Sequence, residues 1–244
     1  MPLLEIKNLV KHFGGIKAVD DCSFSVEKGA ITALIGPNVA GKTTAFNMIS
    51  GLIKPDSGTI TFNGKRIDNL QPHQITRRGV SRTFQISRDL MEMTVLENLV
   101  VQFPTSGVWG LFQASILRHE EERAMELLEF VGIAHLAREK AKNLSYGQKK
   151  LMEFAATLMT EPELILLDEP AGGINPAMMD SIVERIELLN QRGISFLIVE
   201  HNMDVVMNLC NPVIVMAYGK FLTQGPPQQV QNDKRVLEAY LGEA

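Results

Sequence analysis

Cysteine is scarce in this chain of 244 residues, where only Cys22 and Cys210 occur. The two lie far apart in the sequence, and neither belongs to a metal-binding spacing. This is the pattern expected of a protein in a reducing compartment. The sequence therefore predicts neither a disulfide framework nor a zinc site.

Long apolar runs are also missing. The N-terminal residues 1–5 lack a basic region followed by an apolar core, so we expect no signal peptide. No apolar run approaches the roughly 20 residues that a membrane-spanning helix requires. We therefore expect a protein that is soluble by itself, although docking on something that is not soluble stays open.

Positive charge is neither abundant nor clustered. The formal net charge is −4, and Lys and Arg are scattered, so nucleic acid is not a predicted partner. Repeats, low-complexity tracts and heptads are absent as well. The 45% hydrophobic content suits one large α/β domain or two small lobes.

What the chain does contain is a complete phosphate-loop motif, G-x-x-x-x-G-K-[ST], at residues 36–43. It follows the apolar run 31–35 and precedes the apolar-periodic segment 45–49, which is the strand–loop–helix context that the motif requires. Backbone N–H groups and the positive end of the helix bind phosphate in such loops. We therefore predict a nucleoside triphosphate site, with Lys42 at the β- and γ-phosphates and the Thr43 hydroxyl on Mg²⁺. The predicted contacts are Gly36, Pro37, Asn38, Val39, Ala40, Gly41, Lys42, Thr43 and Thr44.

Two acidic residues, Asp168 and Glu169, follow the apolar run 164–167. Acids at the carboxyl end of a buried parallel strand project into the crevice where ligands bind. Asp168 is placed to hold Mg²⁺, and Glu169 is placed to act as the general base or to orient water. A solvated loop would leave the same pattern, but the phosphate loop upstream favours the catalytic interpretation.

A third element, Leu144-Ser145-Tyr146-Gly147-Gln148, opens a predicted helix. Ser145 can cap that helix, and Gly147 leaves room for an approaching phosphate. In this order, the three motifs resemble those of the ATP-binding-cassette (ABC) ATPases, with residues 144–148 as the signature. Further matches are Gln85 as the glutamine loop, His201 as the switch histidine and residues 173–176 as the loop where two subunits touch. The resemblance covers essentially the whole chain.

The order of strand and helix patterns predicts an α/β fold. It is a P-loop NTPase core with a mostly parallel sheet, an N-terminal antiparallel β part and an inserted helical subdomain. Early strands are expected at 4–9 and 22–26, a turn at 55–58 and a strand at 59–62 before the hairpin dipeptide Asn63-Gly64. Later strands are expected at 164–167, 194–199 and 212–216, and helices at 124–131, 148–160, 176–192 and from 202. We divide this single domain into core lobes 1–85 and 161–225, a helical subdomain 86–160 that carries the signature, and a C-terminal helical tail 226–244.

The resemblance implies a mechanism of ATP-driven dimer closure. Two copies, or this chain and a related one, would sandwich two ATP molecules with Mg²⁺. Each ATP would be held by Lys42, Thr43 and Asp168 of one chain and by the signature residues Ser145, Gly147 and Gln148 of the other. Glu169 would activate water, His201 would hold the γ-phosphate, and Gln85 would touch the metal and report the closed state to a docked subunit. Phe13 would stack on adenine, although a lone Phe is also a common core residue.

Within the family, residues 79–85, residues 93–99 and the ending 240–244 resemble the ATPases of high-affinity branched-chain amino-acid importers, and more closely the longer of their two ATPases. This implies a different but related ATPase as partner, two integral membrane subunits, an indirectly acting solute-binding protein, and a place at the cytoplasmic face of the cell membrane. Importers of urea or amides and the lipopolysaccharide-export ATPase are close relatives, so the solute stays open. A soluble cassette acting on DNA or the ribosome, and a small-molecule kinase or GTPase, are weaker alternatives.

The motifs do not account for three features of the sequence. The segment 103–112 carries the only Trp, and we expect it to fold back onto the helical lobe, with a contact surface for a membrane subunit as the alternative. Residues 120–122 are predicted to form a solvated helix face, and His12, His73, His119 and His135 to be surface residues. Finally, Val39 stands where the usual cassette loop has Gly. A β-branched residue there is strained if the position needs a positive φ, so we expect weakened nucleotide affinity. The alternatives are a loop bent from the usual shape and a substitution in a parent chain that had Gly.

Overall fold

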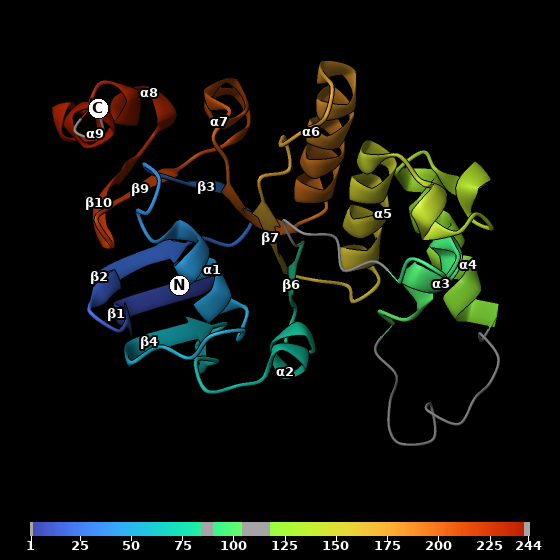
Figure 1. Cartoon of the computed structure of the whole chain (residues 1–244), viewed down its shortest axis with the longest axis horizontal. Coiled ribbons are helices and arrows are strands. Elements are labelled where there is room, and N and C mark those ends of the chain that lie inside the picture. The colour runs from blue at the N-terminus through green and yellow to red at the C-terminus, as the bar shows by residue number, and fades with distance from the viewer. Residues whose placement is uncertain (1, 84–89, 104–117, 242–244) are drawn as a thin grey trace.

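The computed structural model describes residues 2–83, 90–103 and 118–241 of the chain. Two sheets share one end of the molecule and a cluster of helices forms the other (Figure 1). The antiparallel sheet has the order β2-β1-β4-β5. Its strands are β1 (Leu4–Phe13), β2 (Ile16–Val26), β4 (Ser57–Phe62) and β5 (Lys65–Arg66). The predicted N-terminal antiparallel part is confirmed.

The first two strands are longer than their sequence pattern predicts, because they continue to pair as a hairpin as far as Phe13 and Ile16. The turn predicted at 55–58 is wrong in its second half, since β4 begins at Ser57 and pairs with β1 at Val10. The hairpin dipeptide is confirmed. Residues 63 and 64 connect β4 to β5 with φ values of 48° and 71°, which fit the turn type that a two-residue hairpin prefers.

The second sheet has six strands in the order β10-β9-β3-β8-β7-β6. All neighbouring pairs are parallel except β10 and β9. The strands are β3 (Ile31–Ile35), β6 (Val80–Arg82), β7 (Leu164–Asp168), β8 (Ser195–Val199), β9 (Val213–Ala217) and β10 (Lys220–Gly225). The patterns did not predict β6, which is only three residues long, or β10, which is partly exposed and polar.

Both faces of this sheet are buried. Along β7, Ile165 and Leu167 belong to one core cluster, while Leu164 and Leu166 belong to the other. The second cluster lies between the two sheets and includes Phe46 of helix α1 (Lys42–Ile49). Helix α1, which starts within the phosphate-loop motif, is therefore packed between the sheets and held by both.

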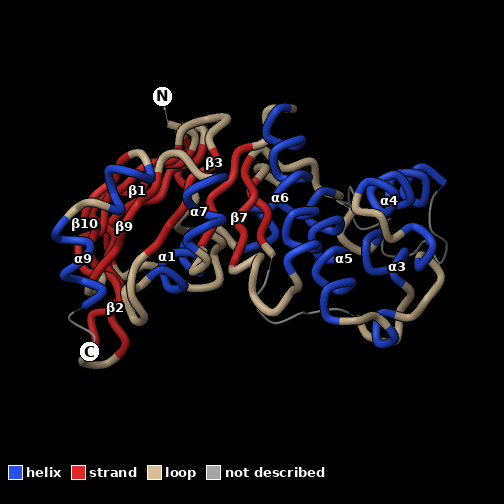
Figure 2. The backbone as a smooth tube through the Cα atoms, turned by 90° about the horizontal axis from the view of Figure 1, so that it is seen from above, coloured by secondary structure: helices blue, strands red, loops and turns tan. Residues whose placement is uncertain are grey.

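Of the remaining helices, one contributes Ile75 to the cluster between the sheets, and the others lie on the other face of the parallel sheet or in the far lobe. These remaining helices are α2 (Pro72–Thr76), α3 (Val95–Val100), α4 (Arg118–Phe130), α5 (Tyr146–Leu158), α6 (Pro176–Gln191), α7 (Met203–Leu209), α8 (Pro227–Gln231) and α9 (Lys234–Leu241), with short 3₁₀ turns η2 (Ala134–Leu136) and η3 (Ala141–Asn143). Figure 2 shows α3, α4 and α5 clustered beyond the β7 side of the sheet. No helix within the described ranges has both the length and the apolar character needed to cross a bilayer.

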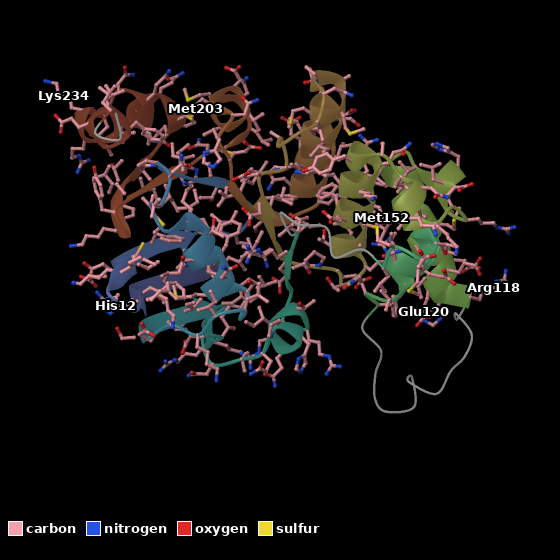
Figure 3. The ribbon with its side chains drawn as sticks, in the orientation of Figure 1. His12, Arg118, Glu120, Met152, Met203 and Lys234 are labelled. Atoms are coloured by element: carbon pink, nitrogen blue, oxygen red, sulfur yellow. The ribbon has the colours of Figure 1, made fainter. Side chains whose placement is uncertain are left out.

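The predicted apolar stripe of α4 and its continuation is buried, at Ala124, Leu127, Leu128 and Val131. The prediction of a solvated face at 120–122 is wrong for Glu120, which is 8% exposed, because it lies one helical turn before Ala124 on the same stripe. Figure 3 shows Arg118 and Glu120 at the helical end of the molecule and His12 at the opposite end, while Met152 of α5 lies where that helix meets α3.

The other sequence expectations have mixed outcomes. The four histidines expected at the surface, His12, His73, His119 and His135, are exposed. In the segment 103–112, Phe103 packs against the larger core cluster and edge-on against His119 at 5.5 Å, while residues 104–112 lie outside the described residues. The division into lobes 1–85 and 161–225, 86–160 and 226–244 stays a prediction.

Candidate functional site

The predicted phosphate loop, acidic pair and switch histidine gather at one edge of the parallel sheet. Strands β3, β8 and β7 are neighbours in that order and run in the same direction. Because the carboxyl ends of parallel strands meet at the same edge, the phosphate loop after β3 lies beside the segment after β8, which lies beside the segment after β7. Those segments carry His201 and the acidic pair Asp168 and Glu169.

Close approach of other backbone explains the glycines of the phosphate loop. A Cβ at Gly36 would lie 2.0 Å from the carbonyl oxygen of Met216, and one at Gly41 would lie 2.3 Å from that of Ala18. Both glycines also have positive φ, at 151° and 95°. The loop is therefore packed against β9 and β2, and its shape is set before any ligand arrives.

Lys42 lies inside this loop. Its side chain is buried, and Nζ donates to the carbonyl oxygens of Gly36 at 2.6 Å and Pro37 at 2.7 Å. Ala40 is buried too, whereas Asn38, Val39 and Thr43 are exposed and Thr44 is half-buried. An ammonium group bonded to loop carbonyls at the start of a helix makes this loop an anion site, since the helix N-terminus adds positive potential.

Val39 has a φ of 60° and is 89% exposed. This is the left-handed region, which a β-branched side chain disfavours. The condition that the sequence analysis attached to this position is therefore met. Its consequence for nucleotide affinity stays a prediction.

Glu169 and His201 are in direct contact. His201 Nε2 lies 3.1 Å from Glu169 Oε1, although the residues are 32 positions apart in the sequence. Glu169 itself has a φ of 50°, and its N–H donates to the carbonyl of Val199 at 2.9 Å. The structure thus brings the two residues that were predicted to be catalytic into one pair, with both side chains partly open to solvent.

Asp168 is almost completely buried and is paired with a residue that the sequence analysis did not single out. Arg82, at the end of β6, donates to Asp168 Oδ2 at 2.8 Å, and both side chains are nearly inaccessible. The same guanidinium donates to Asn47 Oδ1 and Ser50 Oγ of helix α1. Arg82 therefore links the helix of the phosphate loop to the acidic end of β7. A lone Arg after a three-residue strand offers no pattern by which sequence could have found it.

The predicted signature segment does not lie at the edge of the sheet that carries the phosphate loop. Ser145 caps α5, accepting from the N–H of Gln148 at 3.3 Å, while Gln148 Oε1 accepts from the N–H of Ser145 at 2.9 Å. This confirms the capping prediction. Helix α5 lies in the far lobe, across β6 and β7 from α1 (Figure 1). One chain does not bring its signature onto its own phosphate loop.

Two further contacts concern α5. A Cβ at Gly147 would lie 2.2 Å from Met178 Sδ of α6, so the missing side chain also serves packing within the chain. Lys150 Nζ donates to the backbone carbonyl of Glu169 at 2.7 Å. The helix that begins at the signature is thereby attached to the acidic loop of its own chain.

One predicted residue, Phe13, remains outside this cluster, and the structure does not describe another. Phe13 is 48% exposed at the tip of the β1–β2 hairpin, with Lys11 Nζ 5.7 Å from its ring centre. An exposed aromatic ring is free to stack on a flat ligand, so the core alternative is wrong for Phe13. Gln85 lies outside the described residues.

Comparison with known proteins places this site in a class. The family model described as "ABC transporter" matches residues 19–172, and the model described as "Branched-chain amino acid ATP-binding cassette transporter" matches residues 222–244. Among solved structures, a nucleotide-free ATP-binding cassette from an ABC transporter is 38% identical with a TM-score of 0.89, and the alignment covers 98% of both chains. An ATP-binding cassette of an ABC transporter in its ADP conformation is 40% identical with a TM-score of 0.87, covering 99% of both. The chain belongs to the ABC transporter ATPases and has their fold.

Curated relatives narrow the class. The high-affinity branched-chain amino acid transport ATP-binding protein LivG of Escherichia coli (strain K12) is 40% identical over 100% of this chain and 99% of its own length. The corresponding protein BraF of Pseudomonas aeruginosa is 39% identical with the same coverage. Within the ABC ATPases, the chain thus belongs to the family of ATP-binding subunits of branched-chain amino acid importers.

Proposed function

We propose that this chain drives the import of branched-chain amino acids by binding and hydrolysing ATP as one of two ATPase subunits beneath a pair of membrane subunits. Its family supports the solute, since full-length relatives carry branched-chain amino acid transport in their names. The single observation that carries the hydrolytic part is the Glu169–His201 pair beside the phosphate loop.

The proposed motor is a sandwich of two ATPase chains around two ATP molecules. Lys42 and Thr43 bind the phosphates from one chain, and Ser145, Gly147 and Gln148 approach from the other. The position of α5 supports this, because its N-terminus carries donors but lies away from the loop of its own chain. A more distant solved cassette, 23% identical with a TM-score of 0.80, is described as dimeric. That likeness concerns the fold alone.

The donor set fits a divalent cation bound with the nucleotide. Asp168 Oδ1 is buried and has no hydrogen-bond partner among the described residues, while Arg82 holds Oδ2. Mg²⁺ prefers oxygen ligands. The buried carboxylate oxygen of Asp168 and the hydroxyl of Thr43, at the start of α1, are ligands of this type. Asp168 and Thr43 would hold the ion, which supplies neutralisation of phosphate charge. Gln85 is the third residue that we propose near it.

The Glu169–His201 pair then acts on water and phosphate. As the water oxygen attacks the γ-phosphorus and the bond to ADP breaks, Glu169 Oε1 accepts the proton that the water loses. His201 Nε2, which lies at hydrogen-bond distance from that carboxylate in this structure, donates to the γ-phosphate. Phe13 stacks on adenine from the hairpin tip. The positions of Glu169, His201 and Phe13 and the family to which the chain belongs support these proposed roles.

We further propose that the membrane subunits dock between the lobes. A cavity of about 240 Å³ opens there, lined in part by Leu52, Thr76, Arg82, Gln102 and Met152. Arg82 belongs both to this cavity and to the ion pair with Asp168, so a docked segment would lie one side chain away from the acidic end of β7. Such docking holds the chain at the cytoplasmic face of the cell membrane, with the solute-binding protein acting indirectly and no nucleic acid involved.

Two experiments test the proposal. Membrane co-purification from native cells, with peptide identification, should recover a second ATPase and two membrane subunits. Recovery with ribosomes and no membrane subunit would contradict it. In the assembled transporter, Glu169→Gln should lower ATP hydrolysis by roughly 10²–10⁴-fold, because the amide cannot take a proton from water, while ATP binding survives. Glu121→Gln on the exposed face of α4 makes the same charge change and should leave turnover at the wild-type rate. Wild-type turnover in the Glu169 variant would remove Glu169 from its role.

A further inference from the structure

A buried carboxylate lies directly behind the Glu169–His201 pair. Glu200 directly follows strand β8, and its side chain is buried at 3% exposure. Its Oε1 accepts from the N–H of Ala171 at 2.7 Å, and its Oε2 accepts from the N–H groups of His201 at 2.7 Å and Asn202 at 2.9 Å. One carboxylate thus joins the backbone of two loops.

Those two loops are the ones that carry the pair. Ala171 follows Glu169 by two residues, and His201 directly follows Glu200. The same two loops also meet through their side chains, since His201 Nε2 lies 3.1 Å from Glu169 Oε1. The backbone on both sides of that contact is therefore held by the same carboxylate.

We propose that Glu200 is a positioning residue for hydrolysis, which sets the His201 imidazole against the Glu169 carboxylate by clamping both loops. Its hydrogen bonds go to backbone N–H groups of the two loops, and it acts through the other two residues. The inference rests on the proposed hydrolytic roles of Glu169 and His201.

Chemistry explains why this position needs a carboxylate. Three backbone N–H groups converge on it, and an ionised carboxylate offers acceptors on both oxygens and forms the stronger, charge-assisted type of bond. A glutamine offers one acceptor oxygen and turns an NH₂ donor toward the remaining N–H groups. The backbone of Glu169 has a φ of 50°, which is strained, so this loop needs hydrogen bonds that hold it in place.

The test compares Glu200→Gln with wild type in the assembled transporter and in the full chain alone. We expect kcat for ATP hydrolysis to fall roughly 10- to 100-fold, the usual effect of a small misplacement of reacting groups, with ATP affinity unchanged. In the Glu169→Gln background the same change should cause no further loss, because the residue through which Glu200 acts is already disabled. Glu200→Asp keeps the charge but shortens the side chain, so it should lose less than Glu200→Gln.

A spectroscopic readout separates positioning from hydrolysis. In the nucleotide-free chain with ¹⁵N-labelled histidine, the ring-nitrogen resonances of His201, assigned with His201→Gln, report its contact with Glu169. We expect Glu200→Gln to move them toward the values seen in Glu169→Gln. The matched control is Glu163→Gln at the opposite end of β7. Glu163 also accepts hydrogen bonds, from Asn63 and Lys28, and the control should move neither kcat nor these resonances.

Each outcome decides the inference. Unchanged kcat and unchanged His201 resonances in Glu200→Gln would overturn it. So would losses of ATP affinity and melting temperature in step with kcat, which indicate a merely structural role. If Glu200→Gln does not fold, Glu200→Asp carries the same readouts. Wild-type turnover in Glu169→Gln would refute the proposed function instead, and the His201 resonances would still show whether Glu200 holds the pair.

Discussion

Replacing Val39 by glycine tests how a single backbone angle affects nucleotide binding. Val39 has a φ of 60° at the outer bend of the phosphate loop, a conformation that costs a residue with a side chain about 1–2 kcal/mol. Its side chain is 89% exposed, so little packing compensates for this strain. Phosphate binding requires the loop N–H groups to point inward and therefore holds Val39 at the strained angle. Glycine adopts that angle without strain.

The expected result of Val39→Gly is tighter binding of MgATP by about 1–2 kcal/mol, or roughly five- to thirty-fold in Kd. Calorimetric titration of both proteins measures this directly. Thermal unfolding without nucleotide measures the effect of the strain on the stability of the folded chain. Glycine relieves the strain in the folded state but also gives the unfolded chain more freedom, so the two effects partly cancel and we expect a small change in Tm.

Asn38→Gly is the matched control. Asn38 is the exposed neighbour in the same bend, and it is not among the residues with positive φ. Its replacement adds the same flexibility without relieving left-handed strain, so it should weaken MgATP binding or leave it unchanged. Equal or weaker binding by Val39→Gly would refute the reasoning. If Tm rose clearly while affinity stayed constant, the strain would be expressed in folding and not in binding.

Three further predictions follow from other parts of the structure. Arg82→Met should lower the free energy of unfolding by about 3–5 kcal/mol in urea titrations, because it leaves the buried Asp168 carboxylate unpaired. Adding Asp168→Asn should recover part of that loss. Full additivity of the two changes would show that the pair is not coupled. Gln85→Ala should reduce transport-coupled stimulation of ATP hydrolysis much more than basal hydrolysis, and equal losses in the two assays would remove Gln85 from coupling. Burial raises the pKa of Cys22 and Cys210 from about 9 to about 12. Both thiols should therefore resist alkylation at pH 8 until the chain unfolds. Since the folded state holds these protons more tightly, their contribution to stability is present below pH 9 and is lost as the pH rises toward 12, which denaturation midpoints across that range would show.

The sequence carried the local part of this site. The glycines, Lys42 and the strand–loop–helix pattern predicted the phosphate loop, because its chemistry is contained in eight consecutive residues. Continuous apolar runs predicted the buried strands, and period-four apolar residues predicted α4, since each pattern reflects burial of one element by itself. Capping by Ser145 was equally visible, because a capping box spans only four residues.

Contacts between distant segments were decided only by the tertiary structure. Arg82 reaches Asp168 across 86 positions, and Glu200 reaches Ala171 across 29. Neither residue belongs to a periodic pattern, and a single buried charge has no local signal. The exposed Phe13 and the buried Glu120 were likewise set by what packs beside them, not by their neighbours in the sequence. A motif records which groups a ligand needs, but the strand order β3-β8-β7-β6 determines which other side chains hold those groups in place.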